Sequence, residues 1–190
     1  MRLFVAIPIP TEIRESISSF YESLGPVKGI KAVPAENLHI TLDFLGEVGK
    51  EALPGLTESL TFVAGRTLSF TMELKGVGAF PSLAGPKTLW VAMAKEKALF
   101  DLANEVKAAV ASGDQKRFSP HLTVGRVKYE DSSQDRFYNE FTKHKSLSFG
   151  RFRVSSFFLM KSDLTGKTPV YTVMKEFKIK DGENQNGKRQ

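Results

Sequence analysis

The chain has 190 residues, with 27 Lys and Arg against 21 Asp and Glu, and it contains no Cys. It therefore cannot form disulfides, use a thiol nucleophile or bind a metal through thiolates. The net charge of +6 favours a polyanionic partner, although part of that charge lies in the basic C-terminal segment. The apolar run at residues 3–9 is too short to span a membrane and lacks the features of a signal peptide. We therefore expect a cytoplasmic protein that does not contact membranes.

The first half of the chain alternates strand and helix patterns. Apolar residues with helical spacing predict helices over residues 11–24 and 52–64. Strands are predicted over residues 3–7, 30–33, 37–45 and 68–74. Residues 76–85, which contain Pro81, are predicted to form a loop.

The second half continues this alternation, with helices predicted over residues 99–110 and 135–143. Strands are predicted over residues 89–93, 120–127, 152–160 and 171–177. The last two strands follow each other closely and suit antiparallel pairing, so we expect an α+β fold with mainly antiparallel sheets. We expect residues 1–178 to form one bilobal domain and the mostly polar residues 179–190 to form a disordered tail.

Two short strings repeat in similar contexts. His39-Ile-Thr41 and His121-Leu-Thr123 each place a His and a Thr two residues apart in an apolar stretch. Residues two apart on a strand point to the same face of a sheet. The strands predicted to precede the two strings also have similar sequences, Leu-Phe-Val-Ala-Ile and Leu-Trp-Val-Ala-Met, and a helix pattern follows each of them.

This internal similarity predicts a duplicated fold in which two related lobes face each other. Each lobe would contribute a mainly antiparallel sheet to a central cleft, with the helices outside. One His-x-Thr string from each lobe would then line the cleft. The alternative is that both strings are ordinary buried strands, each with a hydrogen-bonded His.

The two strings together offer the residues for phosphoester chemistry without a metal. A pair of His can act as one general acid and one general base. The hydroxyls of Thr41 and Thr123 can hold the non-bridging oxygens of a phosphate. We therefore take His39 and His121 as candidate catalytic residues and the two Thr as candidate substrate-binding residues.

The residues five positions beyond each His are Phe44 and Arg126. An aromatic ring can stack on a nucleobase, and a guanidinium can hold a phosphate. An odd offset, however, points to the opposite face of a regular strand. The two side chains reach the cleft only if each strand bulges or ends nearby, which Gly46 and Gly125 would allow. Otherwise Phe44 belongs to the core and Arg126 is a solvated charge.

Four segments together carry a resemblance to a known family: Arg-Leu-Phe-Val-Ala-Ile at 2–7, Glu-Asn-Leu-His-Ile-Thr-Leu-Asp-Phe-Leu-Gly at 36–46, Pro-His-Leu-Thr-Val-Gly-Arg-Val-Lys at 120–128, and Lys-Ser-Asp-Leu-Thr at 161–165. The chain resembles the two-histidine phosphoesterases and, more narrowly, the RNA 2′,3′-cyclic phosphodiesterases, also called 2′-5′ RNA ligases. The resemblance extends from residue 2 to about residue 177. In the loop before Tyr171 the chain departs from the family's usual order of Thr, Gly and Pro, which leaves the role of that loop and of Tyr171 open.

The resemblance implies a bilobal α+β fold in which His39 donates a proton and His121 accepts one. It also implies that Thr41, Thr123 and Arg126 hold the phosphate and that Phe44 contacts the nucleotide. No metal or other cofactor is implied. The partner is expected to be RNA, or an oligonucleotide, that ends in a 2′,3′-cyclic phosphate, and we expect a monomer.

The expected reaction is hydrolysis of the 2′,3′-cyclic phosphate to a 2′-phosphate, and the same arrangement would also join RNA reversibly through a 2′-5′ linkage. Three alternatives stay open on the sequence. Both His could bind zinc with a carboxylate as third ligand, although no motif indicates that carboxylate. The chain could bind RNA without catalysis, or it could cleave 2′-5′ oligonucleotides or another cyclic phosphate. His144, between two Lys in a predicted surface helix, is not expected in the cleft.

Overall fold

The computed structural model describes residues 1–82, 85–110, 117–132, 134–166 and 168–182. The elements, in chain order, are β1 (Arg2–Pro8), α1 (Thr11–Ser23), β2 (Ile30–Ala32), η1 (Ala35–Asn37), β3 (His39–Glu47), η2 (Lys50–Ala52), α2 (Leu53–Arg66), β4 (Phe70–Phe80), β5 (Thr88–Met93), α3 (Lys97–Val110), β6 (Leu122–Val127), α4 (Gln134–Lys143), β7 (Ser148–Val154), β8 (Ser156–Asp163) and β9 (Val170–Lys178). The α+β class predicted from the sequence is confirmed.

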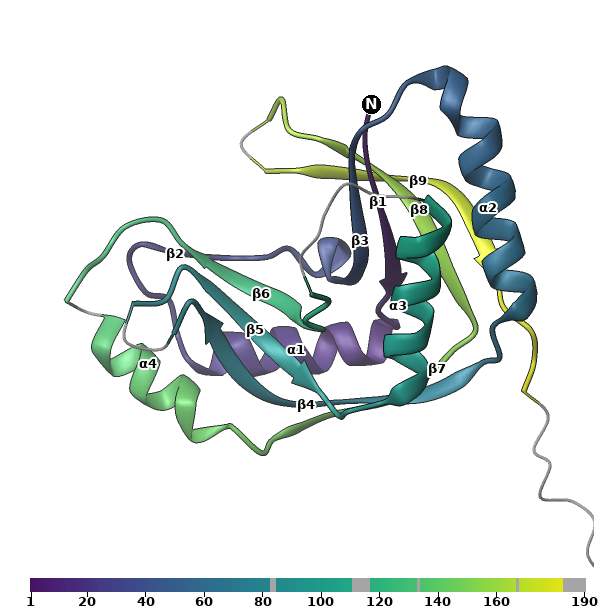
Figure 1. The fold of residues 1–190 in the computed structure, drawn as a ribbon. Helices are drawn as coiled ribbons and strands as arrows, with labels where there is room; N and C mark the ends of the chain where they lie inside the picture. The colour runs from purple at the N-terminus through teal and green to yellow at the C-terminus, as the bar shows by residue number, and fades with distance from the viewer. Residues whose placement is uncertain (83–84, 111–116, 133, 167, 183–190) are drawn as a thin grey trace, which may run out of the picture.

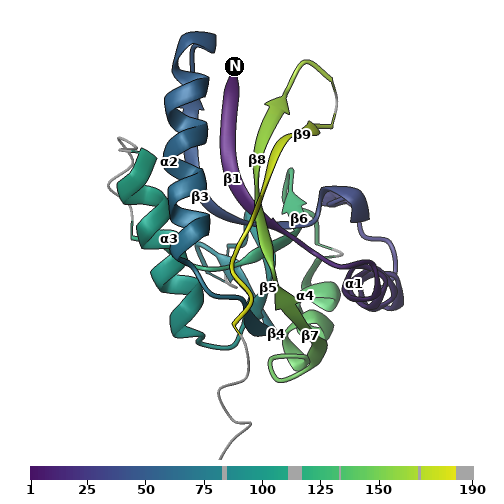
Figure 2. The same cartoon turned by 90° about the vertical axis from the view of Figure 1, so that its right-hand side faces the viewer.

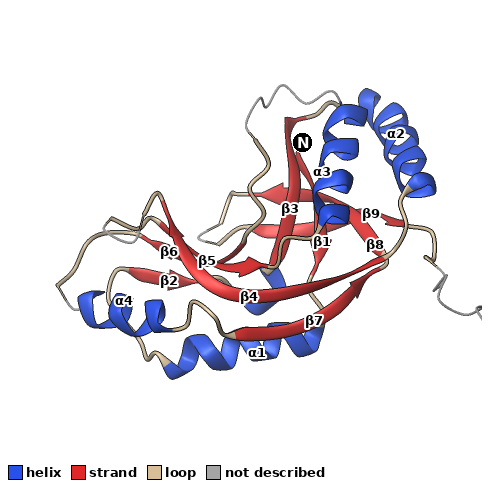
Figure 3. Cartoon of the chain, turned by 60° about the horizontal axis from the view of Figure 1, so that its bottom comes forward, coloured by secondary structure: helices blue, strands red, loops and turns tan. Residues whose placement is uncertain are grey.

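The strands form one sheet in the order β7-β4-β5-β6-β3-β1-β8-β9, with β2 paired to β6 outside this path (Figure 1). The named strand pairs are antiparallel. The sequence predicts two sheets, but a single residue pair, Ile40 with Leu122, joins the two sets of four strands. In Figure 3, β3 runs steeply across the direction of β6, with which it makes this pair. The predicted sheets are therefore two halves of one strongly bent sheet.

The predicted repeat occupies equivalent places in the two halves. β1 pairs with β3, which carries His39, and β5 pairs with β6, which follows His121. Each connecting helix packs on the other half: α1, between β1 and β3, contacts β7, while α3, between β5 and β6, contacts β3. Figure 2 shows α2 and α3 together on one side of the molecule and α1 and α4 on the other.

The helices cover the sheet with the apolar stripes that the sequence predicts. On α1 the buried residues are Ile13, Ile17 and Phe20. On α3 they are Leu99, Leu102, Ala103 and Val106. This spacing follows the helical period, so one face of each helix is removed from water while the other stays exposed. None of the helices that the structure describes is long and apolar enough to cross a membrane.

Two predicted boundaries in the sheet are wrong. The loop expected at residues 76–85 begins later, because β4 continues to Phe80. Gly76 has φ +87°, and the pairing with β5 shifts between Leu74 and Val77, so the strand bulges at this glycine and does not end there. The single strand expected at 152–160 is two strands, β7 and β8. They pair with β4 and β1 respectively, which lie in different halves of the sheet.

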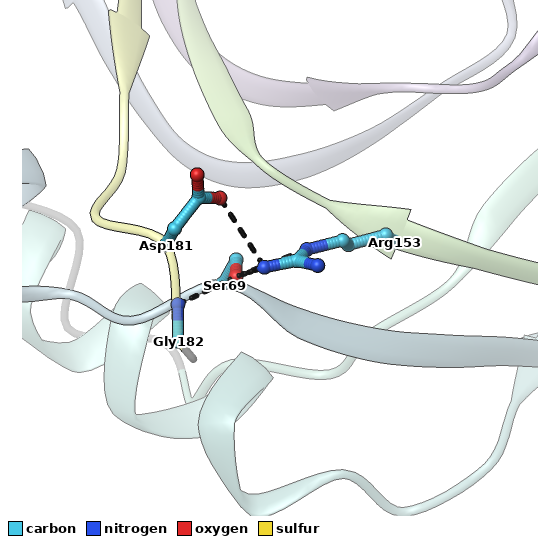
Figure 4. Close-up of polar contacts among 4 residues, drawn as sticks. All are labelled: Ser69, Arg153, Asp181 and Gly182. Atoms are coloured by element: carbon cyan, nitrogen blue, oxygen red, sulfur yellow. Dashed lines mark hydrogen bonds and ion pairs between the residues drawn. The ribbon is translucent and has the colours of Figure 1, made fainter. Parts of the chain in front are cut away.

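The ordered chain also extends beyond residue 178, where the sequence places the start of a tail. Ile179 is 7% exposed, and the backbone N–H of Lys180 donates to the carbonyl of Thr67. The Ser69 hydroxyl accepts hydrogen bonds from Arg153 Nη2 at 2.6 Å and from the N–H of Gly182 at 3.0 Å. Arg153 also pairs with Asp181 at 3.2 Å (Figure 4). The rest of the predicted tail, residues 183–190, lies outside the described residues.

Candidate active site

A β-bulge follows each His-x-Thr string. On β1 the neighbours Val5 and Ala6 pair with Asp43 and Thr41, so Leu42 of β3 has no opposite residue. A β-bulge inserts one residue into the strand, and every later side chain then points to the other face. His39, Thr41 and Phe44 thus come to one face, which the regular alternation of the sequence would not allow.

The second string has the same irregularity at the same place. On β5 the neighbours Leu89 and Trp90 pair with Gly125 and Thr123, so Val124 of β6 is the additional residue. Val124 is buried, as Leu42 is in the first bulge. The bulge brings Arg126 to the face that carries Thr123. Phe44 and Arg126 can reach the cleft only if each strand bulges or ends nearby, and both strands bulge.

All six predicted site residues line one cavity of about 620 Å³, a size typical of small-molecule sites. They are His39, Thr41, Phe44, His121, Thr123 and Arg126. The first three come from β3, and the others come from β6 and the residue just before it. The cavity therefore lies where the two halves of the sheet meet.

The two histidines are held by identical hydrogen bonds. His39 Nδ1 lies 2.7 Å from the carbonyl oxygen of Asn37, and His121 Nδ1 lies 2.8 Å from that of Ser119. A carbonyl oxygen only accepts, so each Nδ1 carries the hydrogen and donates it. Nε2 is then the nitrogen that gains or loses a proton in each ring. A matched pair of titrating nitrogens suits the exchange of one proton in each direction.

Aromatic rings fix the orientation of both imidazoles. The ring of His39 lies 5.0 Å from that of Phe4 and 5.1 Å from that of Tyr171, which it meets edge-on at 88°. The ring of His121 lies 5.0 Å from that of Phe80 at 90°. Tyr171, whose role the departure from the family pattern leaves open, thus contacts a candidate catalytic residue directly.

Burial lowers the pKa of His39 below its ordinary value, because the protonated ring loses hydration. The hydrogen bond to the Asn37 carbonyl opposes this shift, while the positive charges of Arg126 and His121 lower the pKa further. The free site therefore favours neutral His39. A bound anion near the ring would act in the opposite direction and raise the pKa of His39.

The described side chains that line the cavity include cations but no carboxylate. The cations are Arg2, Lys31, Arg126 and Lys128. Part of the chain's excess positive charge thus lies at the cavity, where it attracts anionic substrates.

The loop between β8 and β9 borders the cavity and is tied to the segment before β3. Lys31 Nζ donates to the hydroxyl of Thr168 at 2.7 Å. The side-chain amide of Asn37 donates to the carbonyl of Pro169 at 3.1 Å. These contacts place the loop that precedes Tyr171 beside the His39 end of the site.

The third histidine takes no part in this arrangement. The ring of His144 packs edge-on against Phe20 at 5.0 Å, and the residue is not among those that line the cavity. Within the described part of the chain, no group of three or more His, Asp or Glu side chains could hold a metal ion. Independence of metal stays a prediction.

Sequence reasoning missed several contributors to the site. The carbonyls of Asn37 and Ser119 give no signal, because every residue has a carbonyl. Phe80 approaches His121 from the end of β4, far away in the chain. Lys128 could have been found, because it follows Arg126 by two residues and shares its face of the strand.

Known proteins with similar sequences and structures assign this arrangement to a family. Residues 9–166 match the 2′-5′ RNA ligase superfamily. A protein of Archaeoglobus fulgidus named RNA 2′,3′-cyclic phosphodiesterase is 41% identical over 180 residues, which cover 93% of this chain and 99% of the relative. The crystal structure of TT0787 of Thermus thermophilus matches with a TM-score of 0.81 and 32% identity, covering 96% of this chain and 100% of that one. The crystal structure of E. coli LigT complexed with 3′-AMP matches with a TM-score of 0.74 and 30% identity, covering 94% and 97%. The chain belongs to the 2′-5′ RNA ligase superfamily and, within it, to the family of the RNA 2′,3′-cyclic phosphodiesterases.

Proposed function

We propose that this protein hydrolyses 2′,3′-cyclic phosphate ends of RNA to 2′-phosphates by acid–base catalysis with His39 and His121, without a metal. The observation that carries the proposal is the matched pair of imidazoles at one cavity, each with Nδ1 bonded to the carbonyl two residues earlier. The names of the relatives support the substrate class.

In the proposed reaction, water attacks phosphorus opposite the ribose O3′. Nε2 of neutral His121 takes a proton from the water, and Nε2 of protonated His39 gives one to O3′ as the P–O3′ bond breaks. The product keeps the phosphate on O2′, and the two histidines exchange protonation states. Each positioned proton transfer typically contributes about 10²- to 10⁴-fold in rate.

The other cavity residues stabilise the phosphate as its charge grows. The hydroxyls of Thr41 and Thr123 donate to the non-bridging oxygens, and the Arg126 guanidinium adds a charge-assisted contact. These groups lie on strands and not on flexible loops, so they are oriented before the substrate binds. Phe44, on the His39 side of the cavity, offers its ring to the base of the terminal nucleotide.

The substrate itself prepares His39 for its role. Burial, Arg126 and His121 lower the pKa of His39 in the free protein. A cyclic phosphate carries one negative charge, so its binding raises this pKa and favours the protonated ring that must donate to O3′. Proton uptake is thus coupled to substrate binding.

The same residues also allow a parallel ligation, in which a 5′-hydroxyl of a second RNA attacks the cyclic phosphate in place of water. His121 would take the proton of that hydroxyl, and the product would contain a 2′-5′ linkage. Water is present at a far higher concentration than RNA ends, so hydrolysis is the main activity that we propose.

The test is to incubate the protein with an RNA oligonucleotide that ends in a 2′,3′-cyclic phosphate, in excess EDTA, and to identify the product by ³¹P NMR. We expect a 2′-phosphate at the same rate with and without EDTA. A 3′-phosphate would contradict the assigned leaving group, and loss of activity in EDTA with recovery on adding zinc would contradict the metal-free mechanism. Tight RNA binding without any hydrolysis would indicate the non-catalytic alternative.

A further inference from the structure

One wall of the cavity carries three cations, on β2, on β6 and on the residue just after β6. Lys31 of β2 pairs directly with Arg126 of β6, so their side chains lie beside each other on one face of the sheet. Lys128 follows Arg126 by two residues, a step of about 6.6 Å along a strand. All three line the cavity. Arg126 thus has a second cation next to it and a third one further from the histidines.

This wall is built on a rigid frame. Gln134 of α4 is 3% exposed, and its side-chain amide donates to the carbonyls of Lys28 and Tyr129, each at 2.8 Å. Its carbonyl oxygen accepts from the hydroxyl of Tyr138 at 2.9 Å. The N–H of Lys128 donates to the carbonyl of Gly29 at 2.6 Å. The backbones that present Lys31 and Lys128 are therefore held together beyond the Ile30–Val127 end of this short ladder.

The part of the cavity around His39 has a different character. Phe4, Phe44 and Tyr171 surround the His39 side with aromatic rings. Arg2 of β1 also lines the cavity, and its register partner in β3 is Glu47. Aromatic rings thus surround His39, whereas cations line the wall that Lys31, Arg126 and Lys128 form.

A chain that ends in a 2′,3′-cyclic phosphate matches this division of the cavity. The scissile phosphate occupies the middle, between the histidines, where Arg126 can reach it. The terminal base occupies the aromatic end. The next anionic group of the RNA is the phosphodiester on the 5′ side of the terminal nucleotide, one nucleotide away from the scissile phosphate. Lys128 lies a corresponding step of two extended residues beyond Arg126.

We propose that Lys128, assisted by Lys31, binds the phosphodiester on the 5′ side of the terminal nucleotide, so that the enzyme selects the ends of RNA chains over cyclic mononucleotides. This inference rests on the proposed function and adds a second phosphate site to it. Lys128 contacts a group that does not react, so it acts through binding and leaves the chemistry at the cyclic phosphate unchanged.

The test compares two substrates that share the reacting group. One is adenosine 2′,3′-cyclic phosphate, which has no 5′ phosphodiester. The other is the dinucleotide ApA with the same cyclic phosphate end. For the unmodified protein we expect kcat/KM to be about tenfold higher on the dinucleotide, as one additional charge-assisted contact provides. The logarithm of kcat/KM should also fall more steeply with the logarithm of salt concentration, by about 0.7, on the dinucleotide.

A matched pair of variants separates the second phosphate site from general electrostatics. Lys128→Ala should lower kcat/KM about tenfold more on the dinucleotide than on the mononucleotide, and so remove the preference for the dinucleotide. Lys178→Ala removes the same charge from the exposed end of β9, away from the cavity, and should keep the preference. A dinucleotide with an uncharged methylphosphonate linkage removes the charge from the substrate and not from the protein. Its kcat/KM with the unmodified protein should match that of the natural dinucleotide with Lys128→Ala.

Three results would overturn the inference. Equal kcat/KM on the two substrates would show that no second phosphate site contributes. Full activity on the methylphosphonate would assign the preference to the second base and not to its phosphate. Equal losses in Lys128→Ala and Lys178→Ala would assign it to the overall charge. Failure to open the ring of either substrate would instead reject the proposed function, and this site with it.

Discussion

Replacing Phe44 with Ala tests whether this ring binds the substrate base or supports the core. Phe44 is 57% exposed, and its ring centroid lies 6.1 Å from that of Phe4, which is 2% exposed. The two rings are neighbours of the same size, so Phe4→Ala is a matched control. We expect Phe44→Ala to weaken binding of nucleotides far more than it lowers stability.

The magnitudes follow from the exposed fractions. Truncating a fully buried Phe costs about 3–5 kcal/mol in the free energy of unfolding. Phe44 buries less than half of its surface, so its truncation should cost about 1–2 kcal/mol. For a chain of this size these costs correspond to roughly 2–8 °C in Tm for Phe44→Ala and 6–20 °C for Phe4→Ala. Loss of a base–aromatic stack should cost about 1–3 kcal/mol in binding, or roughly 5- to 150-fold in KM.

The assay measures KM for adenosine 2′,3′-cyclic phosphate and for an analogue that carries hydrogen in place of the base, with Tm determined on the same samples. Phe44→Ala should raise KM for the nucleotide and leave KM for the baseless analogue unchanged. Equal increases for both substrates would refute base stacking. A fall in Tm as large as that of Phe4→Ala, with KM unchanged at a temperature where the variant is folded, would assign Phe44 to packing.

Three further predictions concern the histidines, the arginine and the frame of the cationic wall. His39→Ala and His121→Ala should each lower kcat at least about a hundredfold with Tm nearly unchanged, whereas His144→Ala should keep normal kcat; near-normal turnover in either of the first two would contradict the acid–base assignment. Arg126→Ala should lower kcat. It should also move the basic limb of the kcat/KM profile to higher pH, because the guanidinium lowers the pKa of His39 and its removal lets that pKa rise. A basic limb that stays in place would argue that His39 is not the acid. Gly29→Ala should destabilise the protein by about 1–3 kcal/mol, measured by urea unfolding, because φ is +76° and a Cβ would meet the carbonyl of Tyr129 and the amide of Gln134; an unchanged unfolding midpoint would contradict the rigid frame.

The helical stripes and the His-x-Thr strings could be derived from the sequence because they depend on local periodicity. Ile13, Ile17 and Phe20 lie on one helix face whatever the rest of the chain does. His39 and Thr41 likewise share a strand face by their spacing alone. The repeat added the decisive inference, because two equivalent strings in equivalent contexts imply that both meet at one place.

The predicted strand boundaries are wrong where the same local sequence pattern fits two structures. The aromatic residues on both sides of Ser155 read as one strand, but β7 and β8 bind partners in different halves of the sheet. The glycine at 76 reads as the end of a strand, but its positive φ accommodates a bulge. In both cases the partner strand decides where the strand ends, and the neighbouring residues in the sequence contain no information about that partner.

By itself, the sequence determined which side chains share a face of a regular helix or strand, which residues are candidates for the chemistry, and which family the chain resembles. Only the tertiary structure decided that Leu42 and Val124 are bulged, and hence that Phe44 and Arg126 point into the cavity. It also decided that Tyr171 lies against His39. The physical reason is that side-chain direction along a regular strand follows from the spacing of neighbours, whereas a bulge depends on the register with the opposite strand, and a contact between distant residues depends on how the whole sheet bends.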